Sequence, residues 1–192
     1  MTLTDAQIDR YSRQIIVPHI GGRGQERLLA ARILLVGDAR DIEAPLAYLV
    51  GAGVGTILLK LSGDQAAFTE KRDLNADVSV TIDDGSKSRA DLALVIIGSS
   101  AARKIAEEIA NDRDVRALVI ARLDAPGKIV VVPDPRGPQT AEAQFGARAE
   151  AADFIGMLAT SEAFKLIAGY VENPSQMTIE FDGYETKARI NP

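Results

Sequence analysis

Residues 32–61 decide the fold, and they read RILLVGDARDIEAPLAYLVGAGVGTILLKL. The first six and the last six residues are nearly continuous apolar runs, a pattern typical of strands that a sheet buries on both faces. Between them, apolar side chains recur at the spacing of one helix face: Ile42, Leu46, Leu49 and Val50. The pattern predicts a strand at 32–37, a helix at 41–50 with Pro45 in its first turn, and a strand at 56–61. A strand, a helix and a second strand in this order open a parallel, right-handed βαβ unit.

The rest of the chain continues this alternation of strands and helices. Further strands are expected at residues 78–82, 92–97, 117–121 and 128–132, with helices at 100–111 and 150–171. Runs at 177–181 and 185–190 predict an antiparallel hairpin, because Asp182-Gly183 between them suits a tight turn. We therefore predict an α/β fold: a doubly wound, Rossmann-like, mostly parallel sheet with an antiparallel C-terminal hairpin.

The segment before the first strand is expected to be helical. Thr4 and Gln7 have the spacing of a capping box, in which each side chain satisfies a backbone amide at the start of a helix. Glycines at positions 21, 22 and 24 are expected to interrupt the chain before a short helix at 25–31. We expect residues 1–192 to form a single domain with four parts: N-terminal helices at 1–31, a Rossmann-like core at 32–132, a crossing loop at 133–149, and a C-terminal helix and hairpin at 150–192.

The composition excludes several kinds of chemistry. The chain has no cysteine, which excludes disulfides, a thiolate nucleophile and cysteine-ligated zinc. Its single histidine, His19, excludes a histidine-rich metal site. A net charge of −5 without a concentrated basic patch argues against nucleic-acid and membrane partners. The start of the chain does not resemble a signal peptide, and we expect a cytoplasmic protein.

Three stretches resemble the ThiF/MoeB/HesA family, which includes the enzymes that activate ubiquitin-like proteins. Residues 10–15 read RYSRQI and are similar to the family's R-Y-x-R-Q-I helix. The strand at 32–37, followed at helix length by AGVG at 52–55, is similar to its first βαβ unit. Residues 159–169, ATSEAFKLIAG, followed by FDG at 181–183, are similar to its last helix and hairpin. The order and spacing of these stretches identify the chain as resembling a degenerate, shortened member.

The resemblance implies a chemistry that the residues at the expected site do not support. Family members use ATP and magnesium to adenylate the C-terminal glycine of a ubiquitin-like or sulfur-carrier protein, and a glycine-rich turn after the first strand holds the phosphates. That turn reads Gly37-Asp38-Ala39-Arg40-Asp41-Ile42 here, so one glycine remains. Ala39 and Ile42 are expected to add bulk there, and Asp38, Asp41 and Glu43 add negative charge. Two like charges about 4 Å apart repel by about 4 kcal/mol at an effective dielectric of about 20, so a triphosphate entering this turn would meet repulsion of this order unless Arg40 compensates.

Other residues that the resemblance assigns to the nucleotide are replaced as well. Lys60 stands where the family has the acid that holds the ribose, and Gly98 stands where it has the aspartate that serves the metal. We interpret six residues as a vestigial nucleotide site that holds no cofactor: Gly37, Asp38, Ala39, Asp41, Lys60 and Gly98. We expect Lys60 to pair with Asp38 or Asp41, and the alternative is a contact with the 2′-phosphate of NADP.

Three further features each have a functional and a structural interpretation. The resemblance makes Arg13 a candidate arginine finger that reaches in trans into a partner's nucleotide site, and a surface ion pair is the alternative. The glycines of GAGVG at 51–55 follow a helix, so helix termination explains them better than a dinucleotide site does. Ser99 or Ser100 opens a helix at the end of a strand, and we expect one of them to be its N-cap.

The sequence therefore predicts a non-catalytic member of the ubiquitin-like-activating fold. We expect a dimeric scaffold, either a homodimer or the inactive partner of an active family member. Such a scaffold would bind a small ubiquitin-like or sulfur-carrier protein and no nucleic acid or membrane. The alternative is an enzyme, either a residual adenylyltransferase that uses ATP and magnesium or a divergent dinucleotide-binding enzyme.

Overall fold

The computed structural model describes residues 2–62, 74–83, 89–110, 115–123, 127–132, 152–170, 176–181 and 185–190. The helices in these ranges are α1 (Asp5–Arg10), α2 (Ser12–Ile15), α3 (Gly21–Ala30), α4 (Ala39–Ala52), α5 (Ser100–Ala110) and α6 (Ala152–Ala168). The strands are β1 (Arg32–Gly37), β2 (Thr56–Leu61), β3 (Ser79–Ile82), β4 (Leu92–Ile97), β5 (Leu118–Arg122), β6 (Gly127–Val132), β7 (Met177–Phe181) and β8 (Thr186–Ile190).

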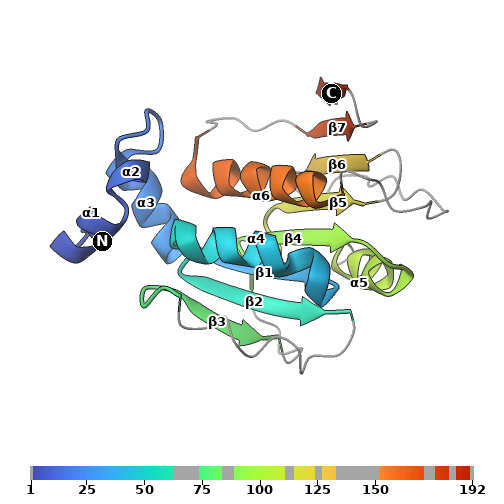
Figure 1. Cartoon of the computed structure of the whole chain (residues 1–192), viewed down its shortest axis with the longest axis horizontal. Helices are drawn as coiled ribbons and strands as arrows, with labels where there is room; N and C mark the ends of the chain where they lie inside the picture. The colour runs from blue at the N-terminus through green and yellow to red at the C-terminus, as the bar shows by residue number, and fades with distance from the viewer. Residues whose placement is uncertain are drawn as a thin grey trace.

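The described strands form one sheet with the order β3-β2-β1-β4-β5-β6-β7-β8 (Figure 1). The five strands from β3 to β5 run parallel to their neighbours. From β5 onward each strand pairs antiparallel with the next, and in the last pair Phe181 faces Thr186 and Met177 faces Ile190. The predicted α/β fold with antiparallel C-terminal strands is confirmed.

Helices cover both faces of the parallel part of the sheet. α4 and α6 lie side by side on one face (Figure 1), where their apolar side chains share a core with alternate residues of β1, β2 and β4. α5 packs on the opposite face over β1 and β4, in a second and smaller core. Every residue of β4 is buried between these layers. Burial on both faces is the physical reason for the continuous apolar runs in the sequence.

The glycines at 21, 22 and 24 lie inside α3, so the expectation that they interrupt the chain is wrong. Gly24 is buried, and a Cβ at this position would lie 2.9 Å from Ile20 Cγ2 and 3.2 Å from the carbonyl oxygen of Ala168. Its missing side chain therefore lets α3 approach the end of α6.

Pro45 lies in the interior of α4, so its expected place in the first turn is also wrong. The helix begins at Ala39, before the predicted start at residue 41. The ring of Pro45 is buried, and this apolar burial offsets the backbone hydrogen bond that proline cannot donate.

Two expected features, the crossing loop at 133–149 and the turn at 182–183, lie outside the described residues. None of the described helices has the length and apolar character that a membrane span requires.

Candidate functional site

The candidate site is the edge of the sheet where the parallel strands end. β1 ends at Gly37 and leads into α4, and the ends of β2 and β4 lie on either side because these strands are the neighbours of β1. Ligands of open α/β sheets bind at this carboxyl edge. All six residues predicted as a vestigial nucleotide site lie at or next to this edge: Gly37, Asp38, Ala39, Asp41, Lys60 and Gly98.

Gly37 makes the close exit from β1 into α4. A Cβ at this position would lie 2.7 Å from Ile42 Cγ2 and 2.8 Å from the carbonyl oxygen of Ile96, so no side chain fits. Ile42 is fully buried and packs against Gly37 from α4. The expectation that Ile42 adds bulk where a phosphate would approach is therefore wrong, because its side chain fills the core.

Asp38 is held against the end of β2. It is the N-cap residue of α4, but its side chain makes no capping hydrogen bond. The hydroxyl of Ser62 donates instead to Asp38 Oδ1, and the amide of Ser62 donates to the carbonyl oxygen of Gly37 over 3.1 Å. Sequence reasoning missed Ser62, although a hydroxyl residue directly after the second strand was the available signal. These contacts fix the Asp38 carboxylate beside the residue that follows β2.

The first turn of α4 adds a second carboxylate. Asp41 is only 9% exposed, and its amide donates to the carbonyl oxygen of Asp38 over 2.9 Å. Arg40 and Glu43, on either side of it in the helix, are exposed. A helix N-terminus favours negative charge, and here the chain's own acidic residues supply that charge.

Lys60 points away from this turn. The residues on either side of Lys60 pack in the core beneath α4 and α6, so the alternation of a strand directs Lys60 to the face that α5 covers. Lys60 Nζ lies 3.8 Å from Glu108 Oε2 on α5. The expected ion pair with Asp38 or Asp41 is therefore wrong, because α4 lies on the opposite face of the sheet.

Two helix ends agree with their structural interpretations. The hydroxyl of Ser99, next to Gly98, accepts a hydrogen bond from the amide of Ala102 over 3.2 Å, so Ser99 caps α5. Gly53 ends α4 in a left-handed conformation, with a φ of 81° and a ψ of 38°. Both observations confirm the interpretations preferred from the sequence.

Arg13 lies far from the turn of its own chain. The helices α1 and α2 lie near the C-terminal end of α4 (Figure 1). There the ring of Tyr11 lies against Gly53. The 14 residues of α4 separate this end from Gly37 by about 20 Å, at a rise of ~1.5 Å per residue. Arg13 is exposed and forms no ion pair within the described ranges. It therefore does not reach the turn of its own chain.

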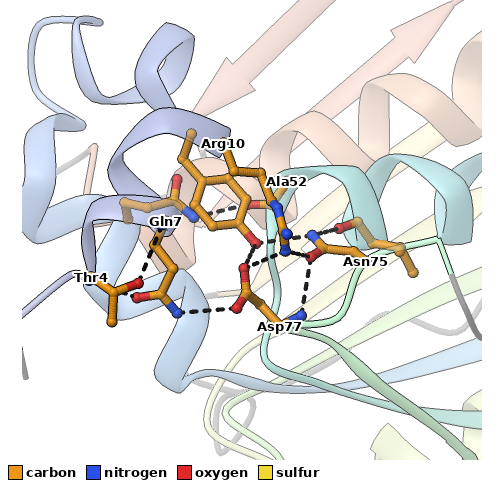
Figure 2. Close-up of polar contacts among 9 residues, drawn as sticks. Thr4, Gln7, Arg10, Ala52, Asn75 and Asp77 are labelled. Carbon is orange, nitrogen blue, oxygen red and sulfur yellow. Dashed lines mark hydrogen bonds and ion pairs between the residues drawn. The ribbon is translucent and has the colours of Figure 1, made fainter.

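A polar cluster that sequence reasoning missed joins these N-terminal helices to the core (Figure 2). We call it the Tyr11 cluster, and its side chains are Gln7, Arg10, Tyr11, Asn75 and Asp77. Tyr11 is buried, and this burial raises the pKa of its hydroxyl. The pairing was not visible in the sequence because about 65 residues separate the two halves of the cluster.

Metal ligands do not gather at any described part of the chain. No group of three or more His, Asp and Glu side chains there is arranged to hold an ion.

Curated relatives match part of the chain, whereas no family model matches it. The chain is 51% identical over 63 residues to an adenylyltransferase and sulfurtransferase uba4 of Pyricularia oryzae, which is 32% of this chain and 12% of that protein. It is 48% identical over 58 residues to a sulfur carrier protein adenylyltransferase of Thermus thermophilus, which is 30% of this chain and 21% of that protein. A probable adenylyltransferase/sulfurtransferase MoeZ of Mycobacterium tuberculosis is 50% identical over 56 residues, 29% of this chain and 14% of that protein.

Solved structures match nearly the whole chain in fold. E. coli MccB with MccA-N7isoASN has a TM-score of 0.64 at 14% identity, covering 94% of this chain and 72% of that one. PaaA has a TM-score of 0.61 at 17% identity, covering 98% and 75%. The matches indicate the ThiF/MoeB family. Within that family, the matched segments span only 12% to 21% of the length of the curated relatives described above.

Proposed function

We propose that the chain is a non-catalytic member of the ThiF/MoeB-like activating fold. In this role it forms a dimer, with a second copy or with an active family member, and binds a small ubiquitin-like or sulfur-carrier protein. Three features support the proposal: an acidic turn after β1, an exposed Arg13 far from that turn, and the face of β7 and β8 that points away from α6.

The acidic turn carries the proposal. A triphosphate bound there would place its charges beside Asp38, which Ser62 holds in position, and beside the partly desolvated Asp41. Like charges about 4 Å apart repel by about 4 kcal/mol at an effective dielectric near ~20. The attraction of a helix N-terminus for an anion amounts to only about 0.3–2 kcal/mol. The residues therefore do not fit ATP, and we assign no cofactor to the turn.

The position of Arg13 supports a role in a dimer. Its side chain is exposed at the end of the molecule opposite Gly37, so it is free to contact a second subunit. As an arginine finger acting in trans, Arg13 would donate to the phosphates of an active partner. In a homodimer the same side chain would contact the turn of the second copy.

The antiparallel part of the sheet supports binding of a small protein. Ile129, Val131 and Ile179 point toward α6, so the alternate residues of β6, β7 and β8 face the other side. At the β6 end of this face Val132 belongs to the core that α5 covers, and the apolar residue Val130 packs against the same core; the residues of β7 and β8 on this face belong to neither core among the described parts of the chain.

The charged residues of the strands on this face are Lys128, Glu180, Lys187 and Arg189. Lys128 pairs with Glu180 over 3.7 Å and Lys187 pairs with Glu185 over 3.2 Å, so Arg189 gives this face its excess positive charge. This face suits an acidic side of a small ubiquitin-like or sulfur-carrier protein.

The alternative function is adenylyl transfer with ATP and magnesium, since the relatives are named as adenylyltransferases. The identity of 48–51% over the matched segments favours it. A divergent dinucleotide-binding enzyme has less support, because Lys60 faces α5 and does not reach the turn where a 2′-phosphate of NADP would lie.

Thermal unfolding with and without ligand separates these functions. A ligand at 100 times its dissociation constant stabilises the folded state by about 2.7 kcal/mol, which for a chain of this length raises the Tm by about 5–10 °C. We expect no shift with ATP and magnesium or with NADP. A shift with ATP would favour the adenylyltransferase. Light scattering at micromolar concentration should show a dimer, and a monomer would exclude the homodimeric form of the proposal.

A further inference from the structure

Asn75 is the centre of the Tyr11 cluster (Figure 2), and its amide group is fully hydrogen-bonded. Its Nδ2 donates to Tyr11 Oη and to the carbonyl oxygen of Val50, both over 2.9 Å. Its Oδ1 accepts from Arg10 Nη1 over 2.7 Å and from the amide of Asp77 over 3.1 Å. Asn75 is only 7% exposed, so each of these bonds is largely shielded from water.

Asp77 collects three donors from the N-terminal helices. Its Oδ2 accepts from Arg10 Nη1 over 2.7 Å and from the hydroxyl of Tyr11 over 3.0 Å. Its Oδ1 accepts from Gln7 Nε2 over 3.2 Å. A polar network whose members are all satisfied holds one arrangement, because any other leaves a shielded group without its partner.

Little else docks these helices on the core. Neither α1 nor α2 contains a buried residue, and Tyr11 between them is only 1% exposed. Ile8 is 45% exposed and Ile16 is 78% exposed, whereas Ile15 is partly buried and α2 packs against α3. Tyr11 is therefore the only fully buried side chain among residues 2–17. Most surface helices dock through an apolar stripe. Here the ring of Tyr11 and its hydrogen bonds take over most of that task.

We propose that Tyr11 and Asp77 are positioning residues for Arg13. Arg13 follows Tyr11 by two residues, so the place where Tyr11 is locked sets where the Arg13 side chain projects. With the cluster intact, Arg13 meets a second subunit in one geometry. With the cluster broken, α1 and α2 take several positions. The role assigned to Arg13 rests on the proposed function, whereas the docking of the helices does not.

The absence of cysteine from the sequence makes a direct distance measurement simple. Ile16→Cys after α2 and Ala101→Cys on α5 replace two exposed residues and give two spin-label sites. Pulsed electron–electron double resonance then measures the distance between the labels at positions 16 and 101, and so between α2 and the core. Diluting the labelled chain with an excess of unlabelled chain removes distances between labels on two subunits of a homodimer. Under these conditions the otherwise unchanged chain should give one narrow distribution. Tyr11→Phe and Asp77→Asn should each broaden it at least about twofold, because each removes hydrogen bonds that hold the helices.

Tyr48→Phe is the matched control, because it removes the same hydroxyl from a tyrosine that is 42% exposed on α4. This variant should keep the narrow distribution. Hydrogen exchange gives a second readout: amides of residues 9–15 should exchange about tenfold faster in Tyr11→Phe than in Tyr48→Phe. Thermal melts confirm that every variant is folded.

Distributions as narrow in Tyr11→Phe and Asp77→Asn as in the unchanged chain, with equal exchange rates, would overturn the inference. The proposed function fails in a different way, through an ATP-dependent Tm shift or a monomeric mass. If ATP shifts the Tm or the chain is a monomer while the distance distributions still broaden in the variants, the cluster positions the helices but Arg13 does not have the assigned role.

Discussion

Replacing Gly53 by alanine tests how firmly Tyr11 is held. Gly53 ends α4 with a φ of 81°, a left-handed conformation that costs a residue with a Cβ about 1–2 kcal/mol. An added Cβ would also lie 2.6 Å from both Cζ and Oη of Tyr11. Tyr11 cannot recede without breaking its bonds to Asn75 and Asp77, and overpacking of this kind costs about 1–3 kcal/mol. We expect Gly53→Ala to lower the free energy of unfolding by about 2–5 kcal/mol.

Gly51→Ala is the matched control at the same helix end. Gly51 lies in the last turn of α4, is exposed, and a Cβ added there meets no heavy atom within 4 Å. Alanine is better than glycine in a helix by about 0.5–1 kcal/mol, so this variant should be at least as stable as the unchanged chain. The two variants add the same atoms two residues apart. Their difference therefore isolates the left-handed cap and the contact with Tyr11.

Urea unfolding followed by circular dichroism measures this difference. The urea midpoint of Gly53→Ala should fall with little change in the slope, and its Tm should be about 4–20 °C lower. Equal midpoints for Gly53→Ala and Gly51→Ala would refute the reasoning, because Tyr11 would then be free to move aside.

Three further predictions concern Tyr11, Lys60 and Gly37. Because burial raises the pKa of Tyr11 above its ordinary value of 10.0, the folded chain keeps a proton that the unfolded chain has lost, so stability should fall as the pH rises above about 10. In Tyr11→Phe, the free energy of unfolding measured in urea should fall less steeply with pH above about 10. An equally steep fall in this variant would contradict the prediction. Lys60→Met should change stability by less than about 1 kcal/mol, because the ion pair with Glu108 is exposed to water; a loss above about 2 kcal/mol in urea unfolding would count against it. Gly37→Ala should cost about 1–3 kcal/mol through its clashes with Ile42 and with the carbonyl oxygen of Ile96, and an unchanged Tm would contradict the tight exit from β1.

The sheet was predictable because its central strands are buried on both faces. β1, β2 and β4 begin and end where the apolar runs of the sequence do. The antiparallel pairing of β7 and β8 was equally visible, since the sequence Asp182-Gly183 between the two predicted strands is typical of a tight turn. The glycines of α3 were misjudged because their local preference for turns is outweighed by the close packing that Gly24 permits against α6.

The site was harder to predict, because it depends on which face of a strand a side chain takes. Lys60 lies near the end of β2, as expected, but strand alternation directs it to α5. Ser62, two residues further on, contacts Asp38 in its place. The Tyr11 cluster was invisible for another reason: only the folded chain brings Asp77 to Tyr11.

Calorimetric titration of the chain with ATP and magnesium tests the central claim, that the turn after β1 does not accept a triphosphate. We predict no saturable heat up to about 1 mM ATP, which excludes a binding free energy stronger than about −4 kcal/mol. Of the variants at this turn, Asp38→Ala should show the highest affinity for ATP, because it removes the carboxylate that Ser62 holds at the start of α4. Saturable binding of one ATP per unchanged chain, with amide resonances of Gly37 and Ala39 shifting in proportion, would contradict the claim.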